Sequence, residues 1–309
     1  MTARPRDWAL TMGLGMIWGA SFMATRVATD DFTPLTLAGV RLTIAALALG
    51  SVLAVVGERL PGFRTRRERL FWLAAAGMAF FSNAMPFTAL SWGQRYIDSG
   101  LAGVFMATVP LFVLPLGHLF VPGESMTLRK VAGFLLGFAG VVVLIGPSAL
   151  AGLGAGPPIA LLAQAACLCA AFGYASGSIV SKLAPQLGLL RFGTAALILA
   201  ALMTLPMAFV LEDPLGSGLS LPGAASMLYL GLVPTALATV MLLTVIGSAG
   251  PGFLSMVNYF VPLWAVVFGV LFLGETPSPR LAVALVMILA GLAVAQNVLG
   301  IRRGGHARG

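Results

Sequence analysis

The stretch at 99–124, SGLAGVFMATVPLFVLPLGHLFVPGE, decides the fold. It carries no charged residue from Ser99 to Gly123. A helix of this length, rising about 1.5 Å per residue, crosses the roughly 30 Å hydrocarbon core of a bilayer. A similar stretch occurs near the C-terminus at 251–275, PGFLSMVNYFVPLWAVVFGVLFLGE. The two stretches therefore predict a membrane protein with an internal repeat.

The similarity extends beyond these two stretches. Pro110 corresponds to Pro262, and Gly123-Glu124 corresponds to Gly274-Glu275 after a one-residue difference in length. The further matches are Arg129 with Arg280, Ala139-Gly140 with Ala290-Gly291, and VRLTIAAL at 40–47 with LRFGTAAL at 190–197. The chain therefore divides into two similar halves, 1–146 and 159–309, which are joined by an uncharged, Gly/Pro-rich linker at 147–158.

The composition excludes a soluble protein. Hydrophobic residues make up 59% of the chain, charged residues 9%, and the mean hydropathy is +0.99, whereas soluble domains contain about 25% charged residues. The net charge of +8 does not indicate nucleic-acid binding, because the basic residues lie in short loops between apolar segments. We expect a multi-pass membrane protein.

The sequence contains no pattern typical of an enzyme, a metal site or a cofactor site. There is no P-loop, no H-E-x-x-H and no G-x-S-x-G motif, and His118 and His306 are the only histidines. Cys167 and Cys169 lie two apart in an apolar run, so on a helix they point to different sides and form neither a disulfide nor a metal pair. We therefore predict no enzymatic activity, no metal and no cofactor.

The apolar segments predict ten membrane-spanning helices. We place them at 8–29, 34–56, 70–92, 99–121, 130–146, 159–181, 188–211, 221–246, 250–273 and 279–299. Ten spans put both termini on one side. If that side is the cytoplasm, 14 Lys and Arg residues lie inside and only Arg26, Arg95 and Arg280 lie outside. Because cytoplasmic loops are enriched in Lys and Arg, we expect cytoplasmic termini and a bacterial-type inner (plasma) membrane.

An odd number of spans in each half reverses the direction of the second half. The loop at 124–129 then faces the cytoplasm, and its counterpart at 275–280 faces outward. Similar halves of opposite topology form an inverted repeat, which transporters use to alternate access to a central site. The predicted fold is all-α, with ten transmembrane helices in two inverted five-helix repeats.

Several short motifs, through their order and duplication, are similar to those of a known family. WGASF at 18–22, VRLTIAAL at 40–47 and the P…GE…G blocks at 110–140 and 262–291 resemble the EamA branch of the drug/metabolite transporter superfamily. The resemblance covers nearly the whole chain. It implies a ten-helix transporter with a central cavity, often an exporter of amino acids or related small metabolites.

Polar and aromatic residues within the spans are the candidate substrate contacts, because a polar group in lipid is costly and usually faces the interior of the bundle. We predict that a cavity between the halves is lined by Trp18, Asn83, Phe105, Gln164, Tyr174, Asn258 and Tyr259, and Arg41 is a further candidate substrate contact. Packing or hydrogen bonding between helices is the alternative interpretation for each of them.

Arg41 has two interpretations. It lies about two turns inside its span, where a buried cation is able to hold a substrate carboxylate. Alternatively, its side chain snorkels to the nearer surface or pairs structurally. Every acidic residue, in contrast, lies at or beyond a span end, which argues against transport that depends on a membrane-buried carboxylate.

These features favour a secondary or facilitative transporter of small organic metabolites that works by alternating access, with export of amino acids or related compounds as the first hypothesis. Uptake of a vitamin- or nucleoside-like solute is an alternative. A membrane enzyme or a sensor scaffold is an alternative of another class, but reactive side chains clustered at depth and a long soluble loop are both missing. The expected partners are the small-molecule substrate and the lipid bilayer, and monomer and homodimer both stay open.

Overall fold

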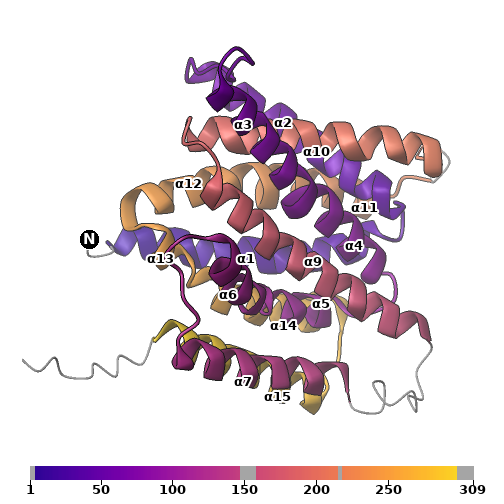
Figure 1. The fold of residues 1–309 in the computed structure, drawn as a ribbon. Helices are drawn as coiled ribbons and strands as arrows, with labels where there is room; N and C mark the ends of the chain where they lie inside the picture. Colours follow the sequence, from indigo (N-terminus) through magenta and orange to yellow (C-terminus); the bar gives the residue numbers. More distant parts are fainter. Residues whose placement is uncertain (1–3, 147–157, 215–217, 298–309) are drawn as a thin grey trace, which may run out of the picture.

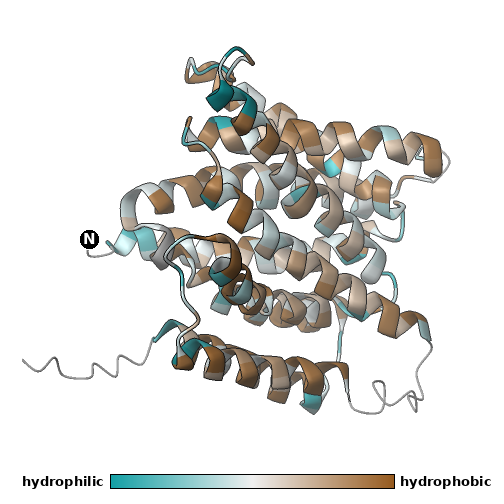
Figure 2. Cartoon of the chain, in the orientation of Figure 1, coloured by the Kyte–Doolittle hydropathy of each residue, from teal (hydrophilic) through white to brown (hydrophobic). Residues whose placement is uncertain are grey.

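The computed structural model describes residues 4–146, 158–214 and 218–297, and these residues form helices and no strand. Eight helical segments are long and apolar enough to cross a membrane. They are Pro34–Val55, Arg66–Gly93, Ser99–Phe120, Leu128–Ile145, Pro158–Leu183, Leu189–Leu211, Leu221–Ala249 and Pro279–Gln296. Hydrophobic residues dominate along the helices, and hydrophilic ones gather mainly near helix ends and loops (Figure 2). The prediction of an all-helical, multi-pass membrane protein is confirmed.

Two further helices, α1 (Pro5–Ala28) and α14 (Val257–Leu273), correspond to the spans predicted at 8–29 and 250–273. α14 is apolar but has only 17 residues. α1 has 24 residues, but its many Gly, Ser and Thr residues make it less apolar. A less apolar helix is tolerated here because α1 is surrounded by protein on several sides. It contacts α14, α5 and the segment from α11 to α12.

The third and fourth segments of each half are interrupted at similar places, where the sequence predicts continuous spans. π-Helical turns η1 (Ala79–Ala84) and η2 (Leu232–Leu237) divide the third segments. The flanking helices are α3 (Arg66–Met78) and α4 (Met85–Gly93) in the first half, and α11 (Leu221–Gly231) and α12 (Ala238–Ala249) in the second. The fourth segments divide into α5 (Ser99–Met106) and α6 (Val109–Phe120), and into α13 (Pro251–Leu254) and α14. Pro86, Pro110 and Pro234 lie at or next to three of these breaks, and proline cannot donate a helical hydrogen bond.

Helices of one half pack mainly against helices of the other half (Figure 1). The remaining helices are α2 (Pro34–Val55), α7 (Leu128–Ile145), α9 (Pro158–Leu183), α10 (Leu189–Leu211) and α15 (Pro279–Gln296). α2 pairs with α10, and α7 pairs with α15 at the lower edge of Figure 1. α1 packs against α11–η2–α12, and in the same way α9 packs against α3–η1–α4. The two halves therefore interlock.

Side-chain contacts sort the helix termini into two groups, which we call end A and end B. End A joins Asp7 to Ser248, Arg67 to Gln186, Glu124 to Lys182 and Glu58 to Arg191. End B joins Asp31 to Ser220, Thr33 to Glu212 and Ser99 to Glu275. The segments linked by these contacts run from one end to the other and back.

Residue types typical of helix ends lie at several helix boundaries. Gly123 and Gly274 have φ angles of 83° and 67°, in the left-handed region that glycine adopts at low cost after a helix. Ser278 precedes α15, and its Oγ accepts a hydrogen bond of 3.2 Å from the Leu281 N–H, with Pro279 at the first helical position.

Candidate substrate site

The side chain of Arg41 lies inside the bundle, where α2 meets η2 and α4. Arg41 is 7% exposed, and its Nε donates a hydrogen bond of 2.9 Å to Thr235 Oγ1. Its guanidinium carbon lies 3.9 Å from the centre of the Phe87 ring, a favourable position for a cation over an aromatic face. The side chain therefore points inward rather than snorkelling to a surface.

The π-helical turn η2 places the oxygen atoms that hold this region together. Thr235 Oγ1 donates to the carbonyl of Leu230 at 2.7 Å, which leaves its lone pairs free to accept from Arg41. The preceding carbonyl, of Pro234, accepts a hydrogen bond of 2.9 Å from Trp18 Nε1. Trp18 on α1 and Arg41 on α2 thus bind consecutive residues of η2.

Tyr174 of α9 completes the group. Its ring centre lies 6.4 Å from that of Phe87 in an edge-on arrangement. We call Trp18, Arg41, Phe87, Tyr174 and Thr235 the Arg41 cluster. Three of these five residues, Trp18, Arg41 and Tyr174, are among the predicted substrate contacts, and the fold brings them together from α1, α2 and α9.

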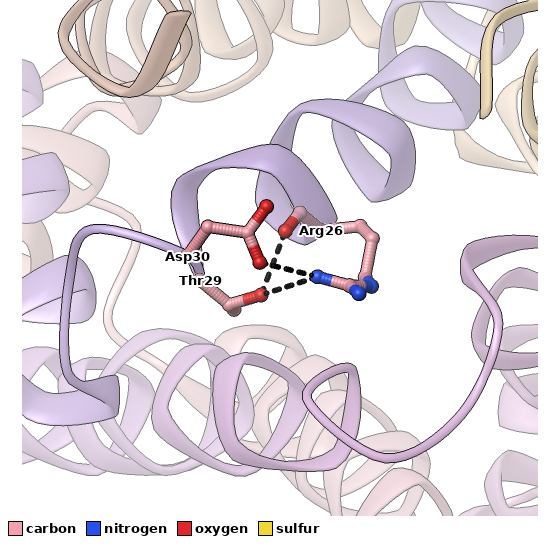
Figure 3. A network of polar contacts seen from close by, with 3 residues as sticks. All are labelled: Arg26, Thr29 and Asp30. Carbon is pink, nitrogen blue, oxygen red and sulfur yellow. Dashed lines mark hydrogen bonds and ion pairs between the residues drawn. The ribbon is translucent and has the colours of Figure 1, made fainter. Parts of the chain in front are cut away.

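Arg41 has no acidic partner among the residues that the structure describes. The three ion pairs there are Arg26–Asp30, Lys182–Glu124 and Arg191–Glu58. Figure 3 shows the first of them, where Arg26 Nη1 lies 2.8 Å from Asp30 Oδ1 and also donates to Thr29 Oγ1 at 3.4 Å. Arg26 and Arg191 are thus neutralised near helix ends, whereas the charge of Arg41 is not.

Two other predicted contacts are buried elsewhere in the bundle. Asn83 of η1 is 8% exposed and donates from Nδ2 to the carbonyl of Met78 in its own helix at 3.2 Å. Phe105 of α5 is fully buried in the main hydrophobic core, which also contains Leu14 and Phe22 of α1. In this conformation Asn83 stabilises the π-helical turn, and Phe105 fills the core.

The last three predicted contacts lie away from the Arg41 cluster. Asn258 donates to the Ser255 carbonyl at 3.0 Å, at the break before α14. Tyr259 donates to Gln296 Oε1 on α15 at 3.1 Å. Gln164 lies near the beginning of α9, and its Oε1 is enclosed without a hydrogen-bond partner. That any of the eight residues contacts substrate stays a prediction.

A cleft of about 1020 Å³ opens toward end B between α2, the η1–α4 segment and α10. Its wall is formed largely by apolar residues, among them Ala84, Met85, Met203 and Met207. None of the eight predicted contacts lines it. Phe87 of the Arg41 cluster belongs to α4, the helix that supplies Met85 and Thr88 to the wall of the cleft, but no residue of the cluster lines the cleft itself.

Carboxylates fasten helix N-termini at end B. Glu212 accepts hydrogen bonds from the Leu35 and Thr36 N–H groups at 3.1 and 2.8 Å, and also from the Thr33 hydroxyl. Burial alone raises the pKa of Glu212, but these hydrogen bonds outweigh it and hold the pKa below its usual value. Glu275 accepts from the N–H groups of Ser99 and Gly100 at 2.6 and 2.9 Å. Both contacts join the two halves at end B.

Thr235 and Phe87, the direct partners of Arg41, are not among the contacts that the sequence predicts. The available signal was Thr235 itself, a polar residue directly after Pro234 near the middle of the span. No group of three or more His, Cys, Asp or Glu side chains suited to a metal occurs in the described part of the chain. There, Cys167 is buried and Cys169 exposed, as expected for residues on different sides of a helix.

The chain is similar to transporters over most of its length. A protein named "Uncharacterized inner membrane transporter YedA" from Escherichia coli (strain K12) is 28% identical over 265 residues, covering 86% of this chain and 82% of its own. A "Probable terminal-alkyne amino-acid exporter" from Streptantibioticus cattleyicolor is 26% identical over 298 residues, covering 96% and 95%.

One solved crystal structure has the same fold, with a TM-score of 0.67 at 21% identity, covering 96% of this chain and 99% of that chain. The profile of the EamA-like transporter family matches residues 8–146 and again residues 161–296. With both halves matched, this chain belongs to the EamA-like transporter family.

Proposed function

We propose that this protein is a secondary or facilitative transporter that exports amino acids or related small metabolites by alternating access. The observation that carries the proposal is the interlocking of the halves. The interrupted third segment of each half packs against the first and second helices of the other half. Such an arrangement is expected where two repeats rock about a shared site. The substrate class is supported by the relative named as a probable amino-acid exporter.

We further propose that ten helices cross the bilayer as two inverted five-helix repeats, 1–146 and 159–309. The alternation of helix termini between ends A and B supports this topology. End A then faces the cytoplasm, because it carries Arg67, Lys182 and Arg191. The name of the Escherichia coli relative supports an inner-membrane location.

Counterflow in proteoliposomes tests the transport function. Purified protein is reconstituted, loaded with one unlabelled compound, and given the same compound in radiolabelled form outside. The panel contains amino acids, nucleosides, vitamins and cationic dyes. We expect saturable counterflow of at least one amino acid, with none in protein-free liposomes. Flux confined to nucleosides or vitamins would contradict the amino-acid class, and no flux of any class would contradict the transport function.

A further inference from the structure

We propose that Arg41 binds the carboxylate group of the transported compound, so that the substrate supplies the counter-charge that no described residue provides. This inference rests on the proposed transport function and extends it to a chemical class and a named contact. Its starting point is that a cation buried in the bundle requires a partner. None of the ion pairs among the described residues includes Arg41.

The hydrogen-bonding groups of Arg41 are only partly used. Nε donates to Thr235 Oγ1, and the guanidinium carbon lies over the Phe87 ring. The two terminal nitrogens have no hydrogen bond within the described part of the chain, yet neither is among the fully enclosed unpaired atoms there. They therefore keep accessible surface. These nitrogens are the fork that binds a carboxylate through two parallel hydrogen bonds.

The surroundings suit a carboxylate that is attached to an apolar or aromatic body. Phe87 and Tyr174 provide ring surface beside the guanidinium. The Tyr174 hydroxyl, like the guanidinium fork, has no hydrogen bond within the described residues and is not fully enclosed. Arg41 and Tyr174 therefore each have a free donor for a substrate carboxylate.

The position of the cluster agrees with a transport site. Arg41 and Phe87 belong to the first half, and Thr235 and Tyr174 belong to the second. A carboxylate bound here contacts both halves, so movement of one half against the other changes its contacts. Arg26 and Arg191 do not offer such a site, because Asp30 and Glu58 already neutralise them.

The test compares wild-type protein with Arg41→Gln, Arg41→Lys and the control Arg191→Gln, each purified at full length and reconstituted. Four probes are used. L-phenylalanine has both the amine and the carboxylate, and 3-phenylpropanoate has only the carboxylate. L-phenylalaninamide has a neutral amide in place of the carboxylate, and phenethylamine has no carbonyl group at all. Each probe competes against the labelled amino acid that gives counterflow. Thermal unfolding with and without each probe reports binding independently of transport.

We expect L-phenylalanine and 3-phenylpropanoate to compete and to raise the unfolding temperature, and the amide and the amine to be at least tenfold weaker. Arg41→Gln should weaken the apparent affinity for carboxylates tenfold or more. Arg41→Lys should be intermediate, and Arg191→Gln should match wild type. The wild-type probe series decides the question even where Arg41→Gln fails to fold.

Two results overturn the proposal. The first is equal competition by the amide and the free acid in wild-type protein. The second is an Arg41→Gln protein that is folded and keeps wild-type affinity for carboxylates. In both cases transport itself continues, so the proposed function stands while the assignment of Arg41 fails. Absence of counterflow for every compound class overturns both.

Discussion

At the scale of single residues, Trp18 shows how one hydrogen bond secures an irregular helix. Its Nε1 donates to the Pro234 carbonyl in the π-helical turn of the other half. A π-helical turn disturbs the regular ladder of backbone hydrogen bonds, and a buried carbonyl without a donor costs free energy. The indole therefore stabilises the backbone that also positions Thr235.

We predict that Trp18→Phe lowers the free energy of unfolding by about 1–3 kcal/mol, because it keeps an aromatic ring but removes the donor to Pro234. Thermal or denaturant unfolding in detergent measures the change. Trp92→Phe is the matched control, since Trp92 packs against Tyr96 with ring centres 5.3 Å apart and donates no hydrogen bond within the described residues. Equal losses in the two variants would show that the hydrogen bond contributes nothing.

Asp98 predicts a dependence of stability on pH. Burial raises its pKa above 3.8, the neighbouring Glu275 charge raises it further, and Arg26 opposes both. A carboxyl whose pKa is raised by folding binds its proton more tightly in the folded state. Its contribution to stability is present at acidic pH and is lost as the pH rises through the folded-state pKa.

As the pH is raised from about 3.8, ionisation of Asp98 should lower the free energy of unfolding. We expect Asp98→Asn to remove this loss, because asparagine does not ionise. Glu275→Gln should shift that loss to lower pH, because the like charge is gone. Unfolding temperatures between pH 3.5 and pH 7, roughly the range of carboxyl titration, provide the measurement. An Asp98→Asn profile parallel to wild type throughout would refute the assignment.

At the scale of elements, close contacts between helices depend on missing side chains. A Cβ atom on Gly19 of α1 would overlap the Cβ of Trp264 and lie 3.0 Å from the backbone nitrogen of Ala265 on α14. A Cβ on Gly133 of α7 would lie 2.5 Å from the Gly291 carbonyl oxygen of α15. Small residues at such positions let membrane helices approach closely.

We expect Gly19→Ala to lower the free energy of unfolding by about 1–3 kcal/mol, because α14 must move away from α1 to admit the methyl group. Gly50→Ala is the matched control. A Cβ at Gly50 in α2 meets nothing within 4 Å, so alanine there should be neutral or stabilising by up to about 1 kcal/mol. Equal unfolding temperatures for both variants would mean that the α1–α14 contact is adaptable.

At the scale of the whole molecule, the two ends differ in charge and in the contacts that close them. End B is held by Glu275 at the N-terminus of α5 and by Glu212 at that of α2. At end A, Glu124 instead pairs with Lys182, and Glu58 with Arg191. The acidic residues that correspond in the two halves, Glu124 and Glu275, therefore have different partners.

Topology is tested with reporters inserted after Phe63 and after Glu212. We expect a cytoplasmic reporter to be active after Phe63 and alkaline phosphatase to be active only after Glu212. The reason is that the loop at 57–65, which lies at end A, is basic. A reporter after Arg308, which lies outside the described residues, should also be cytoplasmic. Phosphatase activity after Phe63 would reverse the orientation and the assignment of end A.

Much of this architecture follows from sequence alone. Helix content and membrane insertion depend on residues close together in the chain, because hydropathy is summed along one segment and backbone hydrogen bonds are local. The repeat is visible because a Gly-Glu pair follows the fourth segment of each half, at 123–124 and 274–275, and both glycines have positive φ angles. The sequence also predicts α1 as a span. Its lower hydropathy is explained only by the tertiary structure, in which other helices surround it.

Only the tertiary structure shows which of the candidate contacts lie together. The eight candidate contacts share polarity or aromaticity, yet only Trp18, Arg41 and Tyr174 come together, while Gln164, Asn258 and Tyr259 lie elsewhere. Arg41 meets Thr235, 194 positions away in the chain, because η2 packs against α2. A local pattern contains no information on contacts over such a distance. They are determined by how helices of the two halves pack, and that depends on every side chain between them.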